Sequence, residues 1–122
     1  MASLYERMGG SYRKMEMVVA QFYQYLLRDE CINGYLIERV SDIPRIHRTL
    51  TEFLVMVFGG PNKYSGKDVG KFHKTMVIRQ YQFDAVWSHL ETSLRAYKVP
   101  EGLIGEAKVI VYTLQDTIVN TK

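Results

Sequence analysis

The chain has 122 residues, of which 47% are hydrophobic and 24% charged, proportions typical of one folded domain and not of a disordered chain. No stretch approaches the roughly 18 uncharged apolar residues of a membrane-spanning helix, and the first ten residues lack the layout of a secretory signal. The net charge of +3 is not gathered into a basic run, so it does not indicate a nucleic-acid partner. We expect a single cytoplasmic domain over residues 1–122.

The first part of the chain has the apolar spacing of helices. A short helical segment over residues 3–8 ends at Gly9-Gly10, where glycine favours a turn. Apolar residues from Met15 to Leu27 then recur at steps of three and four and predict a long helix. Residues 29–34 are typical of a turn, whereas 36–40 support no clear assignment.

A second long helix is predicted over residues 43–58. Ser41-Asp42 followed by Pro44 is typical of a helix start, because a capping side chain precedes a proline whose φ suits the first turn. Gly59-Gly60-Pro61 ends the helix. Residues 62–70 contain two glycines and little periodicity, so we expect a long loop there.

Two further helices are predicted in the last third. One runs from Tyr81 to Tyr97, and another, after Val99-Pro100, carries apolar residues from Leu103 to Ile118. No alternating strand pattern occurs. The sequence therefore predicts an all-α domain with four substantial helices and one long central loop, which leads into His73.

Few residues suit conventional catalysis. The histidines are His47, His73 and His89, and the chain has no HExxH, no paired Cys/His spacing, no phosphate-binding glycine loop and no CxxCH. Cys31 is the single cysteine, which excludes an internal disulfide. Its thiol is either redox-sensitive or, as we expect, buried and inert. Nine tyrosines, five phenylalanines and six methionines indicate either a generous aromatic core or a pocket for a large planar ligand.

Four sequence blocks in a fixed order carry a family resemblance. LYERMGG, QFYQYLLRDE, FGGPNKYSGKDVGKFHKTM and QFDAVWSHLETSL together resemble the truncated haemoglobins of group I, from about Leu4 to Val111. The resemblance implies a globin-like, truncated two-over-two helical sandwich, with helices B and E over helices G and H, around haem b.

The same resemblance implies His73 as the proximal iron ligand. The segment FGGPNKYSGKDVGKFH aligns with the family without a gap, and neutral imidazole is a suitable donor to haem iron. Lys71, Lys74 and Arg79 are candidates to neutralise the haem propionates. The chain has no histidine after His89, so nothing matches the helix-H histidine that bonds haem covalently in some relatives, and we expect non-covalent haem.

On the distal side the resemblance implies a role for Tyr23. A phenol in an apolar pocket can donate a hydrogen bond to bound oxygen, worth roughly 1–3 kcal/mol, which slows ligand escape by about one to two decades. Ile46 and Leu50 fall over the haem, where many relatives have glutamine or another polar residue. We therefore expect moderate oxygen affinity governed mainly by Tyr23.

His47 has two interpretations. At about 100° per residue it flanks the face of Ile46 and Leu50 and is peripheral. However, the connection from Tyr35 to Ile43 is about two residues longer than in relatives, which would allow His47 to turn inward as a sixth iron ligand.

The remaining pocket residues are apolar. Either Tyr35 or Leu36 packs on the haem edge, where the family usually has phenylalanine. The full set expected to line the haem or its access tunnel is Leu36, Ile46, Leu50, Phe53, Leu54, Val69, Phe72, Phe83, Val86 and Val111.

These expectations lead to a function and its alternatives. The resemblance implies a monomeric haem-b protein that reversibly binds O2 and other diatomics such as NO or CO, for oxygen transport or delivery, sensing, or nitric oxide dioxygenation. Dioxygenation needs a separate reductase, since no flavin or nicotinamide motif is present. The first alternative is a bis-histidyl, six-coordinate haem protein for electron transfer or sensing, with His47 on the iron. The second is a haem-free helical interaction module, whose binding would weaken steeply with salt.

Overall fold

The computed structural model describes residues 2–32, 43–62 and 79–119, and within these ranges the chain forms helices and their connections without a strand. The predicted all-α class is thereby confirmed. In chain order the helices are α1 (Leu4–Arg7), α2 (Tyr12–Arg28), α4 (Ile43–Val57), α6 (Gln80–Ala96), α7 (Glu101–Tyr112) and α8 (Gln115–Ile118). None of the described helices is long and apolar enough to cross a membrane.

Helix α2 is the central packing element. Its N-terminus is capped by the Ser11 side chain, which accepts a hydrogen bond from the Lys14 backbone N–H at 3.1 Å. Its buried positions follow the predicted stripe and are Met15, Val18, Val19, Phe22, Tyr23 and Leu26. This stripe lets α2 pack against both α4 and α6.

Helix α4 begins at Ile43 with Pro44 in its first turn, as the sequence predicts, and ends before the two glycines. Gly59 has a φ of +87°, and a Cβ added to Gly60 would lie 2.7 Å from both Tyr5 and Val55. Only glycine fits there, because the chain turns directly against α1. The Tyr5 backbone N–H donates to the Phe58 carbonyl at 2.8 Å and fixes this corner.

Helices α6 and α7 form the second pair. They are joined by a tight connection in which Lys98 has a φ of +64° and the Val99 N–H donates to the Leu94 carbonyl at 3.1 Å. Exposed ion pairs add local ties, such as the 2.6 Å contact between Arg95 Nε and Glu101 Oε1.

The prediction of one helix to Ile118 is wrong, because α7 ends at Tyr112 and the short α8 follows. At the break the Thr113 hydroxyl donates to the Ile110 carbonyl at 2.5 Å, and the N–H groups of Thr113 and Leu114 bond three residues back instead of four.

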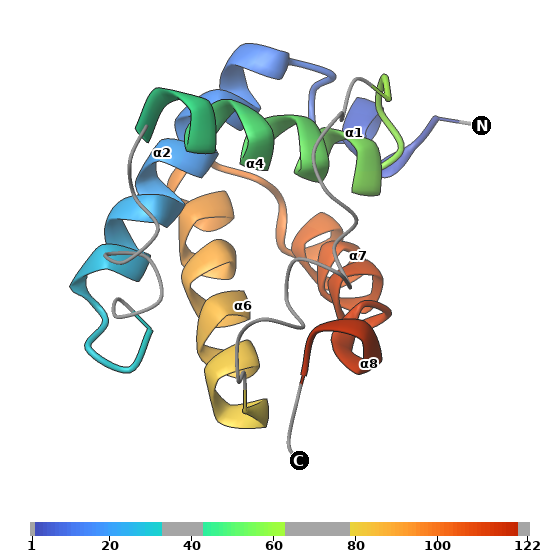
Figure 1. Ribbon diagram of the computed structural model, residues 1–122. Coiled ribbons are helices and arrows are strands. Elements are labelled where there is room, and N and C mark those ends of the chain that lie inside the picture. Colours follow the sequence, from blue (N-terminus) through green and yellow to red (C-terminus); the bar gives the residue numbers. More distant parts are fainter. Residues whose placement is uncertain (1, 33–42, 63–78, 120–122) are drawn as a thin grey trace.

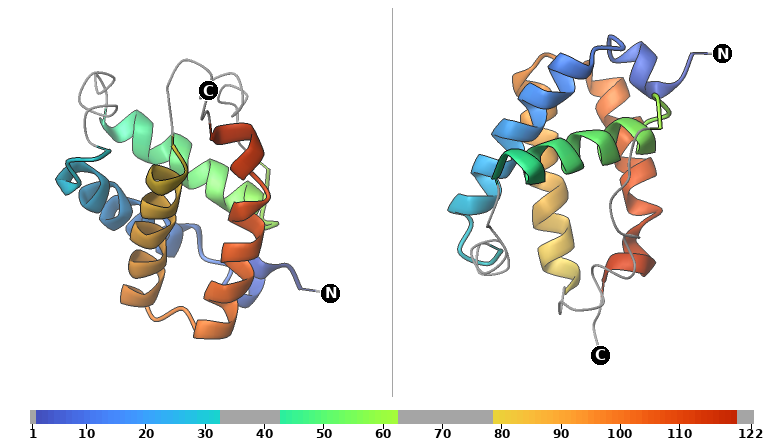
Figure 2. Two further views of the ribbon diagram at one scale, coloured as in Figure 1. Left: turned by 90° about the horizontal axis from the view of Figure 1, so that it is seen from below. Right: turned by 45° about the horizontal axis from the view of Figure 1, so that its top comes forward.

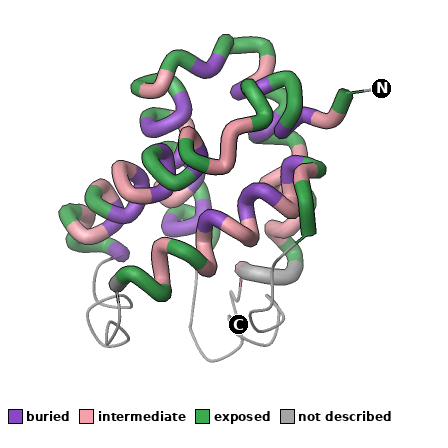
Figure 3. Tube along the Cα trace, turned by 90° about the horizontal axis from the view of Figure 1, so that it is seen from above, coloured by how far each residue is buried: buried purple, intermediate pink, exposed green. Residues whose placement is uncertain are grey.

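The helices are arranged as two crossed pairs. Figure 1 shows α4 crossing above α6 and α7, with α2 beside it, and the two views of Figure 2 show the same layering from other directions. Helix α6 packs against α7, and α1 packs against α7 at the end of the sandwich. Buried residues fall along the inner faces of these helices (Figure 3). This is the two-over-two arrangement that the sequence predicts.

Candidate functional site

The most unusual polar contact in the described part of the chain joins α2 and α4. Tyr23 on α2 is only 1% exposed, and its ring packs edge-on against the ring of His47 on α4. The ring centres are 5.1 Å apart and the planes are 75° apart. The backbone beneath His47 is held by Thr51, whose hydroxyl donates to the His47 carbonyl at 2.7 Å.

One polar atom of each side chain lacks a hydrogen-bond partner among the described residues. Both the Tyr23 hydroxyl and the His47 Nε2 are buried, and neither meets a donor or acceptor among the described residues. Buried polar groups in proteins are nearly always bonded, and leaving one unpaired costs roughly 1–3 kcal/mol. Two such atoms in contacting side chains make this the candidate site among the described residues.

Burial reinforces the protonated form of Tyr23. Removal from water raises the pKa of the Tyr23 phenol, because desolvation disfavours the phenolate. A phenol is already protonated at neutral pH, so the hydroxyl is available as a donor.

The structure places His47 against Tyr23, and its position relative to the haem face stays a prediction. Beside the face of Ile46 and Leu50, α4 has a second and more deeply buried stripe. The residues of that second stripe are Thr51, Leu54, Val55 and Phe58. His47 lies one turn before Thr51 on this stripe, about 100° around the helix from Ile46, and therefore reaches Tyr23.

The predicted lining residues on the described helices differ in burial. Ile46, Leu50 and Phe53 on α4, with Val86 on α6 and Val111 on α7, are half-buried and pack against the core. Leu54 and Phe83 are buried, and Phe83 packs edge-on against Tyr112 with ring centres 5.0 Å apart. Half-exposed apolar side chains on three neighbouring helices suit an apolar ligand that covers them.

Several predicted site residues lie outside the described residues. These are Tyr35, Leu36, Val69, Lys71, Phe72, His73 and Lys74. Arg79 is described and lies at the N-terminus of α6, where it is exposed. Its backbone N–H donates to Gln82 Oε1 at 2.8 Å.

His89 is paired and has a structural role. Its Nε2 lies 2.7 Å from Asp29 Oδ2, which joins α6 to the end of α2, and the hydrogen bond from His89 lowers the pKa of the Asp29 carboxyl. Next to it, the buried Gln82 amide donates to the Cys31 carbonyl at 2.9 Å. Cys31 itself is exposed, so the prediction of a buried thiol is wrong. The reason is its place in the turn after α2, where Asp29 Oδ1 accepts from its N–H at 2.9 Å.

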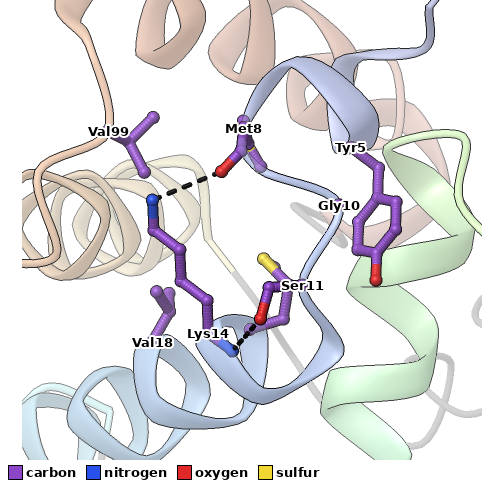
Figure 4. A pocket seen from close by; sticks show the side chains of 8 residues that line it. Tyr5, Met8, Gly10, Ser11, Lys14, Val18 and Val99 are labelled. Carbon is purple, nitrogen blue, oxygen red and sulfur yellow. Dashed lines mark hydrogen bonds between the residues drawn. The ribbon is translucent and has the colours of Figure 1, made fainter.

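Two small hollows lie elsewhere. The first, drawn in Figure 4, has a volume of about 10 Å³, which is near the minimum for one water molecule. It lies beneath α1, where Lys14 Nζ donates to the Met8 carbonyl at 3.3 Å. The second, of about 120 Å³, is lined by Tyr5, Tyr12, Glu52, Val55 and Pro61. Neither includes Tyr23 or His47, and no cluster of metal-ligating side chains occurs among the described residues.

Comparison with known proteins connects this geometry to a family. The bacterial-like globin model matches residues 3–120. The group 1 truncated haemoglobin of Tetrahymena pyriformis is 34% identical over 117 residues, which is 95% of this chain and 94% of the relative. A group 1 truncated haemoglobin of Synechocystis is 32% identical over 114 residues, 90% of each chain.

Solved structures agree with the sequence comparison. The crystal structure of truncated haemoglobin from T. pyriformis in the Fe(III) form superposes with a TM-score of 0.90 at 29% identity, over 98% of this chain and 100% of that one. The 2/2 haemoglobin from Synechococcus, in the cyanomet state and with covalently attached haem, superposes with a TM-score of 0.86 at 27% identity, over 98% and 99%. This chain therefore belongs to the bacterial-like globins and, within them, to the group 1 truncated haemoglobins.

Proposed function

We propose that this protein binds haem b non-covalently and uses it to bind O2, and other diatomics such as NO or CO, reversibly. The observation that carries the proposal is the pair of buried, unpartnered polar atoms on Tyr23 and His47, in a chain that belongs to a family of haem-based gas-binding proteins. Without a ligand, both atoms are an uncompensated cost to the fold.

The residues on both sides of the proposed site suit haem. Bound haem would supply an iron atom with a coordination position for the gas. We assign His73 as the proximal ligand, on the strength of the family resemblance. Lys71, Lys74 and the exposed Arg79 are the proposed partners of the propionates.

The distal residues would hold and shield the ligand. The Tyr23 phenol is protonated at neutral pH, and burial raises its pKa further, so it can donate a hydrogen bond. Ile46 and Leu50 offer no polar group, and their apolar side chains would exclude water. We propose the same lining role for Phe53, Leu54, Phe83, Val86 and Val111 among the described residues.

We propose that the haem is not covalently attached. The chain has no histidine after His89, whereas the similar Synechococcus structure holds its haem covalently. We further propose that residues 1–122 act as one monomeric globin domain in the cytoplasm. If O2 and nitric oxide are converted to nitrate, the haem is left oxidised by one electron, so a separate reductase must restore it.

The test is a titration of the purified protein with haem, followed by visible absorption spectra in the ferric and dithionite-reduced forms. We expect one haem per chain, a strong Soret band, and reversible spectral changes with O2 and CO. His73→Ala should lose stoichiometric haem. The matched control is His89→Ala, which removes the histidine paired with Asp29 and should keep the haem spectrum. Absence of stoichiometric haem, together with salt-sensitive binding of nucleic acid, would favour the interaction-module alternative.

A further inference from the structure

The Tyr23 hydroxyl and the His47 Nε2, which lack a partner among the described residues, together indicate more about the proposed gas site than Tyr23 alone. The Tyr23 hydroxyl comes from α2 and the His47 Nε2 from α4, and the side chains that carry them are in ring contact at 5.1 Å. With the rings packed edge to face, the two atoms do not bond to each other. They belong to one local region and both lack an acceptor among the described residues.

The chemistry of the two groups is compatible with a shared ligand. A phenol donates through its hydroxyl, and a neutral imidazole with its proton on Nε2 donates through that nitrogen. The adjacent α4 stripe of Ile46, Leu50, Phe53 and Val57 has no side-chain donor.

We propose that His47 is a second hydrogen-bond donor to the diatomic ligand, acting beside Tyr23. The inference rests on the proposed haem function. The ligand it favours is a diatomic whose outer atom carries partial negative charge, as O2 does on ferrous haem, over the less polarised CO. His47 is thus a specificity-determining residue of the gas site and not an edge residue or an iron ligand.

The test uses the haem-loaded protein with single changes at His47. His47→Phe keeps a ring against Tyr23 but removes Nε2, and His47→Leu repeats the test without a ring. His47→Gln places an amide nitrogen near the position of Nε2. Arg48→Gln, at the exposed neighbour on α4, is the matched control.

Two measurements report on the donor. The O2 dissociation rate should rise about three- to tenfold in His47→Phe and His47→Leu, since one neutral hydrogen bond is lost, and should change much less in His47→Gln and Arg48→Gln. The C–O stretching frequency of the carbonmonoxy form should rise in the same two variants, because a positive dipole near the outer oxygen is removed. Unchanged values in His47→Phe and His47→Leu would overturn the proposal.

A double variant separates direct donation from an effect through Tyr23. If His47 reaches the ligand itself, His47→Phe should accelerate O2 release by a similar factor in the Tyr23→Phe background. If the effect disappears there, His47 only orients the Tyr23 ring and the proposal is overturned.

The unliganded ferrous spectrum tests direct coordination. We expect five-coordinate iron in the wild type and in His47→Phe. A six-coordinate spectrum that reverts to five-coordinate in His47→Phe would place Nε2 on the iron, which overturns the donor proposal and supports the bis-histidyl alternative. Failure of haem binding overturns the proposed function together with this inference. Stoichiometric haem that requires His73, with an O2 dissociation rate that is unchanged in His47→Phe and His47→Leu, overturns this inference alone.

Discussion

In two regions of α2 the ring of a tyrosine lies near the ring of a histidine from another helix, but the two regions differ in their hydrogen bonds. Near the middle of α2, Tyr23 packs on His47, and the Tyr23 hydroxyl and the His47 Nε2 are buried without a partner among the described residues. Two residues further along, the rings of Tyr25 and His89 lie 6.1 Å apart, and the His89 Nε2 is bonded to Asp29 at 2.7 Å. The first region joins α2 to α4 and the second joins α2 to α6.

The difference between the two regions lies in hydrogen bonding. The His89 Nε2 is bonded to Asp29 at the end of α2, and Gln82, two turns earlier on α6, is bonded to Cys31 in the turn that follows. This region needs no ligand and contributes to the stability of the fold. The Tyr23–His47 region leaves two polar atoms that no described residue satisfies. Burial of a histidine is therefore less informative about function than the absence of a partner for it.

The largest effect should come from replacing Tyr23 by phenylalanine, compared with the same replacement at Tyr25. Tyr23→Phe removes a donor at the proposed gas site and should speed O2 dissociation by about ten- to a hundredfold, the equivalent of roughly 1–3 kcal/mol. Tyr25→Phe is the matched control and should leave the rate within about twofold. Stopped-flow displacement of O2 measures both. Equal rates in the two variants would remove the functional distinction between the regions.

Where α6 is bonded to the turn after α2, loss of a hydrogen-bonding side chain should lower the free energy of unfolding. Gln82 is buried, and its amide both donates to the Cys31 carbonyl and accepts from the Arg79 N–H. Gln82→Leu should lower the free energy of unfolding by about 1–3 kcal/mol, because these groups lose their partner. Urea denaturation measures the change. The control is Gln80→Leu on α6, whose side-chain hydrogen bonds to Asp84 and Gln115 are exposed to water, and it should stay within about 0.5 kcal/mol. A neutral Gln82→Leu would show that the pairing is not a source of stability.

In the Tyr23–His47 region, loss of a polar group should not lower the free energy of unfolding of the haem-free protein. Tyr23→Phe deletes a hydroxyl that has no partner among the described residues, so urea denaturation without haem should give a free energy of unfolding that is unchanged or higher by up to about 1 kcal/mol. A clear loss of stability would mean that the hydroxyl is bonded within the apoprotein, which would weaken its assignment to a ligand.

The smallest effect concerns acid stability. The hydrogen bond from His89 lowers the pKa of Asp29 below its ordinary value of 3.8, so its contribution is present above that pH and is lost as the pH falls through the folded-state pKa. Denaturation between pH 5 and pH 2, roughly the range over which such carboxylates titrate, should therefore show a shallower acid loss in Asp29→Asn than in the wild type. Identical slopes would show that the ion pair does not contribute to acid stability.

The sequence by itself determined the helices and the family. Helices α2, α4 and α6 could be predicted because their apolar residues recur with the period of a helix. The turn at Gly59 and Gly60 could be predicted because glycine adopts backbone conformations and close approaches that other residues do not. The family resemblance depends on the order of short blocks. The end of the last helix was missed because the hydrogen bond of Thr113 to the backbone leaves no mark in apolar spacing.

Only the tertiary structure decided which side of each helix meets which neighbour. Periodicity orders the faces of α4, but the packing of α2 selects the stripe that turns inward and brings His47 to Tyr23. The bond from His89 to Asp29 likewise joins residues that are distant in the sequence. Hydrogen-bond satisfaction is a property of such long-range contacts, so the distinction between the structural and the functional histidine could not be made before the helices were packed.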